Sequence, residues 1–481
     1  MTISSAIPTE STCPDRAHAL HIIIVGGGLA GMAAAVALEE AGAWVTLIES
    51  RKSLGGRASS FEDPQTGETL DNCQHVLLGC CTNLLDFYRR IGVENHIRYE
   101  RTVHFVDPQG GAHNLTAVRG LPAPLHLGPS FARFSALTLR ERVALSRAML
   151  AMMRLGKAGR LALADVSFGQ WLDEHHQPAS LVEKMYDPIL VGSLNEDCRR
   201  ASAAYAIQVF QDALLANARG YVIGLPACPL SELYAKLPCR DVRPATRVSH
   251  IRFQNGKAIG VELSGGEFLP ADAVVLATNY HAVMRWVPGE LAARDSRFAN
   301  LDRLESVPIL GAHMWFDRPV LSENHAAFIR GPLQWLFKKD ADGKAVHGVI
   351  SAARQWLDVP RDDSLRQFER QIREVFPRAR EAKLIRGVTV IEKRATFAPT
   401  PGIDRLRPRQ APPPGGIENL YLAGDYTLSG WPATMEGAVR SGYLAAGAIV
   451  DAMGTTPFTK AGKSFITPDL PVQWPARLLG L

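Results

Sequence analysis

Residues 22–50 read IIIVGGGLAGMAAAVALEEAGAWVTLIES, an apolar run followed by a glycine-rich turn, small residues and a second apolar run. This order predicts a buried strand, a turn, a helix and a parallel strand, which together form a βαβ unit. The glycines follow the spacing G-x-G-x-x-G directly after the first strand. The stretch therefore predicts that the chain binds a dinucleotide, and the rest of the sequence must indicate which one.

The three glycines have separate roles in such a turn. Gly26 permits the tight turn, Gly28 lets backbone N–H groups approach a pyrophosphate, and Gly31 allows the helix to pack closely on the strand. The helix begins at about Leu29 and Ala30, where its N-terminal N–H groups face the phosphate charge. These five residues form the first part of the predicted cofactor site.

An acidic residue narrows the choice of dinucleotide. Glu49 ends the second strand, 21 residues after Gly28, where a carboxylate can accept the two hydroxyl groups of a ribose. A carboxylate at this position would repel a 2′-phosphate, so FAD or NAD is expected rather than NADP. Ser50 and Arg51 follow directly and are included in the predicted site.

The stretch ESRKSLGGRASS (49–60) favours FAD. Gly55 and Gly56 open backbone amides toward the ligand, and Arg57 is suited to neutralising the charge of a diphosphate. A plain surface turn with a solvated arginine is the alternative interpretation.

A second stretch near the end of the chain, YLAGDYTLSGWPATMEGAVRSG (421–442), also favours FAD. A strand ends there at Gly424 and Asp425, whose carboxylate is suited to a ribityl hydroxyl. The helix that opens near Met435, Glu436 and Ala438 can point backbone amides at the carbonyl edge of a flavin. Glu436 itself either approaches the flavin or caps this last helix.

Composition and charge exclude several classes of protein. The 481 residues are 46% hydrophobic and 21% charged, which is typical of a globular protein with two or three domains. The net charge of +5 comes from 53 basic and 48 acidic residues and does not indicate nucleic-acid binding. The seven cysteines include no CxxC pair, so neither a disulfide framework nor a metal site is expected.

We expect a cytoplasmic protein. The start of the chain lacks the pattern of a signal peptide, and no apolar run reaches the ~18 residues of a membrane-spanning helix. Peripheral contact with the inner face of the membrane remains open. Residues 122–165 and the tail PVQWPARLLGL (471–481) are the candidate contact regions.

Dinucleotide-binding features at the start, middle and end of the chain predict one cofactor domain built from separated segments. We expect a flexible N-terminal segment (1–20), a cofactor domain (21–85, 215–285 and 415–455), a substrate domain (86–214 and 286–414) and a C-terminal tail (456–481). Residues 86–214 are expected to be mainly helical, with a capping box at Thr138 and Glu141. Asn255-Gly256 predicts a β-hairpin.

Together, the glycine turn, Glu49, the Gly55-Gly56-Arg57 run and the terminal AGD…EGAVRSG pattern resemble the FAD-dependent amine oxidase and phytoene desaturase superfamily over nearly the whole chain. The resemblance implies an α/β fold with a Rossmann-like FAD-binding domain of the glutathione reductase-2 type and an inserted α+β substrate domain. It also implies that FAD lies extended, with its flavin near the C-terminal helix. The adenine would lie near Glu49 and contact the backbone of Val248.

Three further stretches resemble the squalene-associated, desaturase-like branch of this superfamily, which includes hydroxysqualene dehydroxylases. They are LDNCQHVLLGCCTNLLDFYRRIG (70–92), EKRATFAPTPG (392–402) and AGDYTLSGWPATMEGAVRSG (423–442). The resemblance implies a long C30 isoprenoid substrate with an allylic-type hydroxyl, and squalene as the product, as in squalene and hopanoid biosynthesis. The apolar residues of 145–155 either line a long pocket or form ordinary core.

Replacing a hydroxyl by hydrogen requires a hydride, an acid and stabilisation of a developing cation. We predict His75 as the acid, although it is also suited to binding a flavin phosphate or a backbone group. Asp71 is a second candidate that could simply hold its turn, and Tyr426 and Trp431 either face the cation or pack structurally. The electron donor that would reduce FAD is not indicated.

Three other functions remain open. A carotenoid-type desaturase would transfer hydride in the opposite direction, and the sequence does not separate the two directions. A flavin amine oxidase would need a cage or an acid for an ammonium group, and no convincing set is visible. A non-catalytic prenyl-binding protein, like the GDP-dissociation inhibitors, is disfavoured by flavin features at both ends of the chain.

Overall fold

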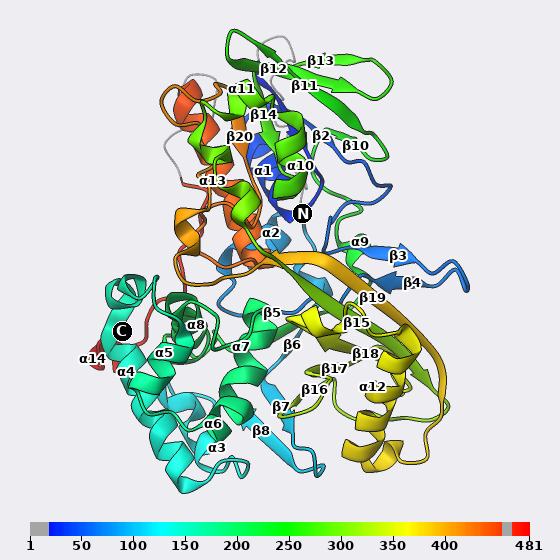
Figure 1. Cartoon of the computed structure of the whole chain (residues 1–481), viewed down its shortest axis with the longest axis vertical. Coiled ribbons are helices and arrows are strands. Elements are labelled where there is room, and N and C mark those ends of the chain that lie inside the picture. The colour runs from blue at the N-terminus through cyan, green and yellow to red at the C-terminus, as the bar shows by residue number, and fades with distance from the viewer. Residues whose placement is uncertain (1–18, 455–463) are drawn as a thin grey trace, which may run out of the picture.

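The computed structural model describes residues 19–454 and 464–481. Residues 1–18, most of the segment predicted to be flexible, lie outside the described residues, as do residues 455–463 of the linker and tail. Figure 1 shows two lobes, one above the other, with the long strands β15 and β19 running along the boundary between them. The mixed α/β fold agrees with the fold class predicted from the sequence.

The upper lobe contains a five-stranded parallel sheet. Its strands lie in the order β10 (Asp241–Arg243), β2 (Trp44–Ile48), β1 (His21–Val25), β14 (Ala273–Leu276) and β20 (Leu420–Leu422). The helices α1 (Leu29–Ala41) and α13 (Met435–Met453) pack together beside it. Because both faces of the sheet are covered, β1, β2, β14 and β20 are almost entirely apolar and buried, whereas the edge strand β10 is half-buried.

A three-stranded antiparallel sheet completes this lobe. It consists of β11 (Val248–Gln254), β12 (Lys257–Leu263) and β13 (Phe268–Pro270). Asn255 and Gly256 have φ values of 51° and 78° between the first two strands, which confirms the predicted hairpin.

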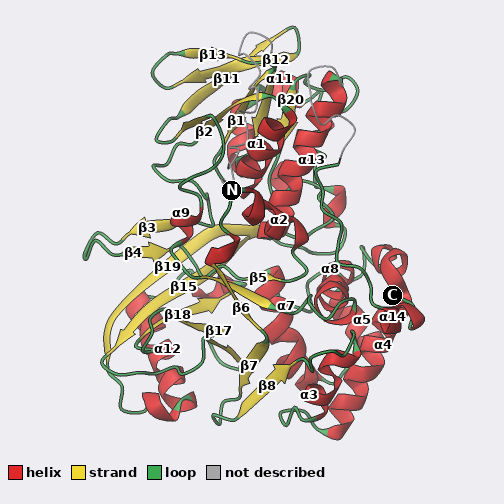
Figure 2. Cartoon of the chain, turned by 180° about the vertical axis from the view of Figure 1, so that it is seen from behind, coloured by secondary structure: helices red, strands yellow, loops and turns green. Residues whose placement is uncertain are grey.

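The lower lobe contains a seven-stranded sheet that is antiparallel apart from one pair. The order is β19 (Leu384–Phe397), β15 (Ser306–Phe316), β18 (Ala345–Ile350), β17 (Trp335–Lys338), β16 (His325–Phe328), β7 (Thr102–Val106) and β8 (Ala112–Thr116). The helix α12 (Arg361–Val375) lies beside this sheet in both views (Figures 1 and 2).

Helices gather on the other side of the lower lobe, as Figure 2 shows. They are α3 (Gly128–Ala132), α4 (Leu139–Ala162), α5 (Phe168–Glu174), α6 (Ala179–Leu181), α7 (Asp187–Leu194) and α8 (Ala203–Val209), with π-helical segments η3 (Val182–Tyr186) and η4 (Phe210–Leu215). The predicted capping box is present at the start of α4, where Thr138 and Glu141 bond reciprocally.

The expectation that residues 86–214 are mainly helical holds only after residue 117. Strands β6 (Ile97–Glu100), β7 and β8 come first, and their alternating buried and exposed residues have the two-residue period of strands. The alternation is short and interrupted by the turn at 107–111, so the helical pattern that follows it dominates the sequence signal.

Shorter elements connect these parts. The strands are β3 (Ser60–Glu62), β4 (Thr69–Asp71), β5 (Leu77–Leu78) and β9 (Ile223–Pro226). The helices are α2 (Thr82–Arg90), α9 (Leu230–Leu233), α10 (Tyr280–Trp286), α11 (Gly289–Ala292) and α14 (Trp474–Leu478). The 3-10 turns are η1 (Glu94–His96), η2 (Leu125–Leu127), η5 (Ser296–Phe298), η6 (Leu301–Arg303), η7 (Ala353–Trp356), η8 (Pro377–Ala379) and η9 (Ile403–Arg405).

Within the described ranges, none of the helices has both the length and the apolar character needed to cross a bilayer.

Candidate active site

A cavity of about 810 Å³ lies where the two lobes meet. Its upper part is formed by the carboxyl ends of β1, β2 and β14 and by the start of α13. Its lower part is formed by α7, α8 and the sheet strands β15, β17, β18 and β19. One continuous space therefore contacts both the predicted cofactor residues and the lower lobe.

The glycine turn has the close packing that the sequence predicts. A Cβ atom on Gly31 would lie 1.9 Å from the carbonyl oxygen of Gly26, so only glycine lets α1 start this close to β1. Gly26 itself has a φ of 115°. The N–H of Gly55 donates to the carbonyl oxygen of Gly27 at 2.8 Å, which joins the two glycine segments.

The carboxylate of Glu49 is held in place at the carboxyl edge of the parallel sheet, directly after β2. It accepts hydrogen bonds from the N–H of Gly27 at 2.8 Å and from the N–H of Arg51 at 2.8 Å. The hydroxyl of Ser50 donates to it at 3.1 Å. Glu49 and Val248 both line this end of the cavity, so a ribose and its adenine can reach the carboxylate and the start of β11 together.

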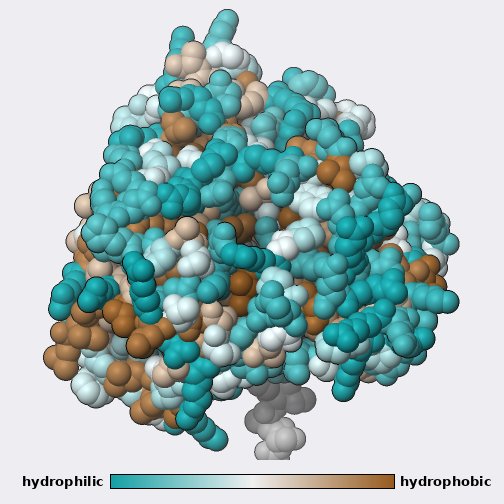
Figure 3. Space-filling view, turned by 60° about the horizontal axis from the view of Figure 1, so that its bottom comes forward, coloured by the Kyte–Doolittle hydropathy of each residue, from teal (hydrophilic) through white to brown (hydrophobic). Residues whose placement is uncertain are grey.

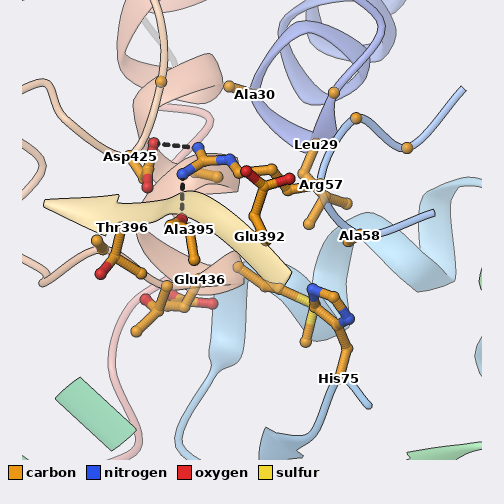
Figure 4. A pocket seen from close by; sticks show the side chains of 18 of the residues that line it. Leu29, Ala30, Arg57, Ala58, His75, Glu392, Ala395, Thr396, Asp425 and Glu436 are labelled. Carbon is orange, nitrogen blue, oxygen red and sulfur yellow. Dashed lines mark hydrogen bonds and ion pairs between the residues drawn. The ribbon is translucent and has the colours of Figure 1, made fainter. Parts of the chain in front are cut away.

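Arg57 and Asp425 form an ion pair across the cavity wall (Figure 4). The guanidinium donates to Asp425 at 2.5 Å and to the carbonyl oxygen of Ala395 on β19 at 2.5 Å. The sequence predicts that Arg57 neutralises the charge of a diphosphate, with a solvated surface arginine as the alternative. In this structure its charge is shared with Asp425, so the pair ties the start of the chain to its end and to the lower lobe.

Glu436 has a role that the sequence did not predict. Its carboxylate is fully buried and accepts hydrogen bonds from the N–H of Asn83 at 3.1 Å and the N–H of Leu84 at 2.7 Å. These N–H groups belong to the first turn of α2, whose N-cap residue Cys81 makes no capping bond with its side chain. Glu436 therefore caps α2 rather than its own helix, which Thr434 caps.

The predicted cofactor residues fit FAD in their arrangement. The cavity is lined by Gly26, Gly28, Leu29, Ala30, Glu49, Ser50, Arg51, Gly55, Gly56, Arg57, Val248, Gly424, Asp425, Met435, Glu436 and Ala438. Gly31 does not line the cavity and acts through helix packing. Glu49, the acid that suits a ribose, lies at one end of this set of residues. The N-terminus of α13 lies at the other end, as an extended dinucleotide requires.

His75 lines the cavity, and Figure 4 shows its imidazole facing the same space as Glu392. Its Nδ1 lies 2.9 Å from the carbonyl oxygen of Cys73, so Nδ1 carries a proton and donates it. Burial lowers the pKa of His75, and the charges of Arg57 and Lys339 act in the same direction. In the neutral imidazole Nε2 is therefore an acceptor.

Asp71 lies outside the cavity lining. Its carboxylate accepts hydrogen bonds from Ser60 at 2.9 Å, the N–H of Leu230 at 3.0 Å and Lys339 at 3.0 Å. Burial opposes ionisation, but Lys339 and the N–H of Leu230 bring the pKa of Asp71 below its usual value. These contacts support the structural alternative, in which Asp71 holds its turn, and not the acid role.

The two aromatic candidates differ in position. Trp431 lines the cavity and packs with Cys80 and Ala213, and the Arg440 guanidinium lies 5.6 Å from its ring centroid. Tyr426 is 1% exposed, does not line the cavity and packs near Tyr280 with ring centroids 5.8 Å apart. These contacts support the alternative for Tyr426, in which it packs structurally.

Several residues at the cavity were not among the predicted site residues, although three of them lie in the stretch 392–402 that resembles the desaturase-like branch. Glu392, Arg394 and Thr396 share one face of β19, and Asp212 projects from η4. The two-residue spacing on β19 is a signal that sequence reasoning could have used. Asp212 had no comparable signal, because only the packing of η4 against the cavity brings its carboxyl there.

Comparisons with known proteins agree with this site. Residues 29–450 match the family described as flavin containing amine oxidoreductase. The chain belongs to this family, its cofactor is FAD as the sequence predicted, and it is a flavin-dependent oxidoreductase.

The names of two similar curated proteins refer to isoprenoid substrates. The chain is 30% identical to a hydroxysqualene dehydroxylase from Rhodopseudomonas palustris over 89% of this chain and 98% of that protein. It is 24% identical to a 15-cis-phytoene desaturase from Synechococcus elongatus over 90% and 96% of the two chains.

The structure of cyclohexylamine oxidase from Brevibacterium oxydans has the same fold, with a TM-score of 0.64 and 18% identity over 90% and 99% of the chains.

Proposed function

We propose that this protein removes the hydroxyl group of hydroxysqualene reductively to give squalene. The observation that carries the proposal is the 30% identity to hydroxysqualene dehydroxylases over almost their whole length. Identity to the phytoene and zeta-carotene desaturases is lower, at 24–26%. In this proposal the upper lobe, from the predicted cofactor segments, holds FAD, and the lower lobe holds the isoprenoid.

The lower part of the cavity suits a long hydrocarbon. Apolar side chains from four elements line it: Ile189 on α7, Val209 on α8, Trp335 and Phe337 on β17, and Val349 on β18. Such a surface binds an isoprenoid through apolar contact and excludes water from the reacting carbon.

When bound in its reduced form, FAD supplies the hydride for this reaction. The chain must then position the hydroxyl, protonate it and stabilise the allylic cation that develops as it leaves. Trp431 presents an aromatic ring at the cavity for the last of these tasks. The neutral Nε2 of His75 can accept the hydrogen of the hydroxyl and orient it, whereas an acid role would require the imidazolium.

A carotenoid-type desaturase is the second candidate. The lowered pKa of His75 favours it in one respect, because a neutral imidazole can take the proton that leaves a hydrocarbon during desaturation. The direction of hydride transfer separates the two proposals. Purified holoprotein should be incubated with hydroxysqualene and a flavin reductant, with phytoene and an oxidant, and with an amine and oxygen. Squalene in the first reaction alone supports dehydroxylation, and a desaturated product in the second alone contradicts it.

The acid role of His75 is tested with His75→Ala and His75→Gln in single turnovers with prereduced flavin. If imidazolium is the acid, both variants lose about a hundredfold or more. The wild-type rate must also decrease as the pH rises through the lowered pKa of His75, because only the protonated ring can donate. Unchanged rates in both variants remove His75 from the acid role.

We also propose peripheral association with a membrane of anionic lipids. The N–H of Ala123 donates to Gln473 at 2.6 Å, which brings together the two regions that the sequence indicates. The apolar patch there consists of five exposed side chains: Leu121, Leu125, Trp474, Leu478 and Leu479. Figure 3 shows apolar residues gathered at the lower left of this face, on the side where α4 and α14 lie in Figure 1.

Flotation with liposomes tests this second proposal. The double variant Trp474→Ser, Leu478→Ser should lose binding, because these side chains are 62% and 78% exposed and supply most of the apolar area. Leu357→Ser is the matched control, since Leu357 is 40% exposed but belongs to a different surface. Equal flotation of all three proteins contradicts the proposal.

A further inference from the structure

Asp212 and Trp431 line the same cavity. Asp212 is on η4, the π-helical segment that directly follows α8, and its side chain is 24% exposed. The next residue, Ala213, packs in one cluster with Cys80 and Trp431. π-Helical turns are rare and occur frequently at functional sites. The segment thus brings an acid to the same cavity as the aromatic ring of Trp431.

The charges around Asp212 come from several elements. They are Arg160 and Lys157 on α4, Asp469 in the C-terminal segment, Cys80 after β5 and the polar Gln208 on α8. Arg160 is the nearest cation, with its NH1 atom 3.6 Å from Asp212 Oδ1. This distance is an ion contact rather than a hydrogen bond, because NH1 donates to Gln211 at 2.9 Å instead.

Burial shifts the pKa of this carboxyl toward its neutral form. Burial raises the pKa of Asp212 above its usual value, Asp469 acts in the same direction, and the attraction of Arg160 only partly opposes them. The pKa of His75 is lowered, so burial favours the neutral form of both groups in this cavity. A neutral carboxyl group can donate a proton, and a neutral imidazole can accept one.

We infer that Asp212 is the proton donor to the departing hydroxyl, an inference that rests on the proposed dehydroxylation. The carboxyl proton moves to the hydroxyl oxygen, the C–O bond breaks, and its electron pair leaves with the oxygen as water. The carbon accepts a hydride from the reduced cofactor, which is oxidised. The Asp212 carboxylate then takes a proton from solvent, so atoms and charge balance.

This assignment gives the three cavity residues distinct tasks. Asp212 donates the proton, Trp431 faces the developing positive charge, and His75 accepts a hydrogen bond from the hydroxyl. The carboxylate left on Asp212 is also an anion close to that positive charge, which lowers the barrier further. A neutral amide at position 212 would keep the shape of the side chain but lose both effects.

The test compares Asp212→Asn, Asp212→Glu and the matched control Asp187→Asn in single turnovers of hydroxysqualene with prereduced holoprotein. Asp187 is also half-buried with a raised pKa, but it does not line the cavity. Asp212→Asn should be slower by about a hundredfold to ten-thousandfold. Asp212→Glu should retain most of the rate with a shifted pH profile, and Asp187→Asn should match the wild type.

A readout independent of turnover is the infrared band of a protonated carboxyl, followed while the pH is changed. Because Glu436 also lines the cavity with a raised pKa, the Asp212 band is identified by difference. Wild type and Asp187→Asn should share one carboxyl band that Asp212→Asn lacks, and this band should titrate above the usual range of aspartate. The wild-type rate should fall as the pH rises through that titration, because only the protonated form donates.

The outcomes separate the inference from the function on which it rests. If wild type makes squalene and Asp212→Asn makes it equally fast, the inference is overturned and the proposed function stands. If wild type makes no squalene, the proposed function fails and the donor role fails with it. Flavin absorbance and the unfolding midpoint of each variant verify that it is folded. If Asp212→Asn does not fold, the pH profile of Asp212→Glu decides, because a profile identical to that of the wild type would overturn the inference.

Discussion

The sharpest structural prediction concerns Glu436, which sequence reasoning placed at the flavin or at the cap of its own helix. In the structure its carboxylate joins α13 to the first turn of α2. Three donors contact it: the N–H of Asn83 at 3.1 Å, the side-chain amide of Asn83 at 2.9 Å and the N–H of Leu84 at 2.7 Å. Arg440 also approaches at 3.4 Å. Glu436→Ala leaves these buried groups without their acceptor.

The size of the effect follows from those contacts. A buried N–H left without a partner costs about 1–3 kcal/mol. Arg440 adds little to this cost, because it keeps its ion pair with Asp469 at 2.8 Å. Water from the adjoining cavity can replace part of the loss, so we expect Glu436→Ala to lower the free energy of unfolding by about 3–5 kcal/mol. Glu436→Gln retains one acceptor oxygen, and we expect about half that loss.

The assay is urea unfolding of the apoprotein followed by circular dichroism, together with a separate titration of FAD into each apoprotein. If the Glu436 side chain caps α2, its loss lowers the free energy of unfolding and leaves the flavin spectrum of the FAD-bound protein unchanged. A variant with normal stability whose FAD affinity falls tenfold or more would show that Glu436 contacts the flavin, and would refute the capping role.

The pH dependence of the stability provides a control, because the direction of the pKa shift of Glu436 fixes the direction of the change. Burial raises the pKa of Glu436 above its usual 4.5, so the folded protein holds this proton at a pH where the unfolded chain has released it. Its contribution is therefore fully present below pH 4.5 and decreases as the pH rises through the folded-state pKa. Glutamine does not titrate, so the stability difference between wild type and Glu436→Gln should shrink over that interval.

Three further predictions test other parts of the molecule. Gly31→Ala should abolish FAD binding, because its Cβ would lie 1.9 Å from the Gly26 carbonyl oxygen and must displace α1; protein that is yellow when purified would contradict this. Glu141→Gln should lose about 2–3 kcal/mol of stability at neutral pH, because hydrogen bonds, including those from Lys184, outweigh burial and hold the pKa of Glu141 at about 2. This loss should be full above pH 4.5 and vanish as the pH falls toward 2, as urea unfolding at several pH values would measure. Trp431→Leu should slow single-turnover dehydroxylation by about 5–30-fold while Trp431→Phe retains most of the rate, and equal rates would assign Trp431 to packing alone.

Within the site, the sequence predicted best where the chemistry is local. Gly26, Gly28 and Glu49 lie in one βαβ unit, so their spacing alone indicates how a dinucleotide meets them. The Asn255-Gly256 turn and the capping box of α4 are local in the same sense, and both are present. Asp71 and Tyr426 were less predictable, because a side chain's direction depends on distant partners such as Lys339.

The sequence by itself determined the class of fold, the cofactor and the edge of the sheet at which it binds, because glycine geometry and strand periodicity are properties of adjacent residues. Only the tertiary structure decided that Arg57 pairs with Asp425, that Glu436 caps α2, and that Asp212 joins His75 and Trp431 in one cavity. These contacts join residues that are far apart in the chain. Their protonation and partners depend on burial and on charges brought together by packing, and no pattern of neighbouring residues encodes either.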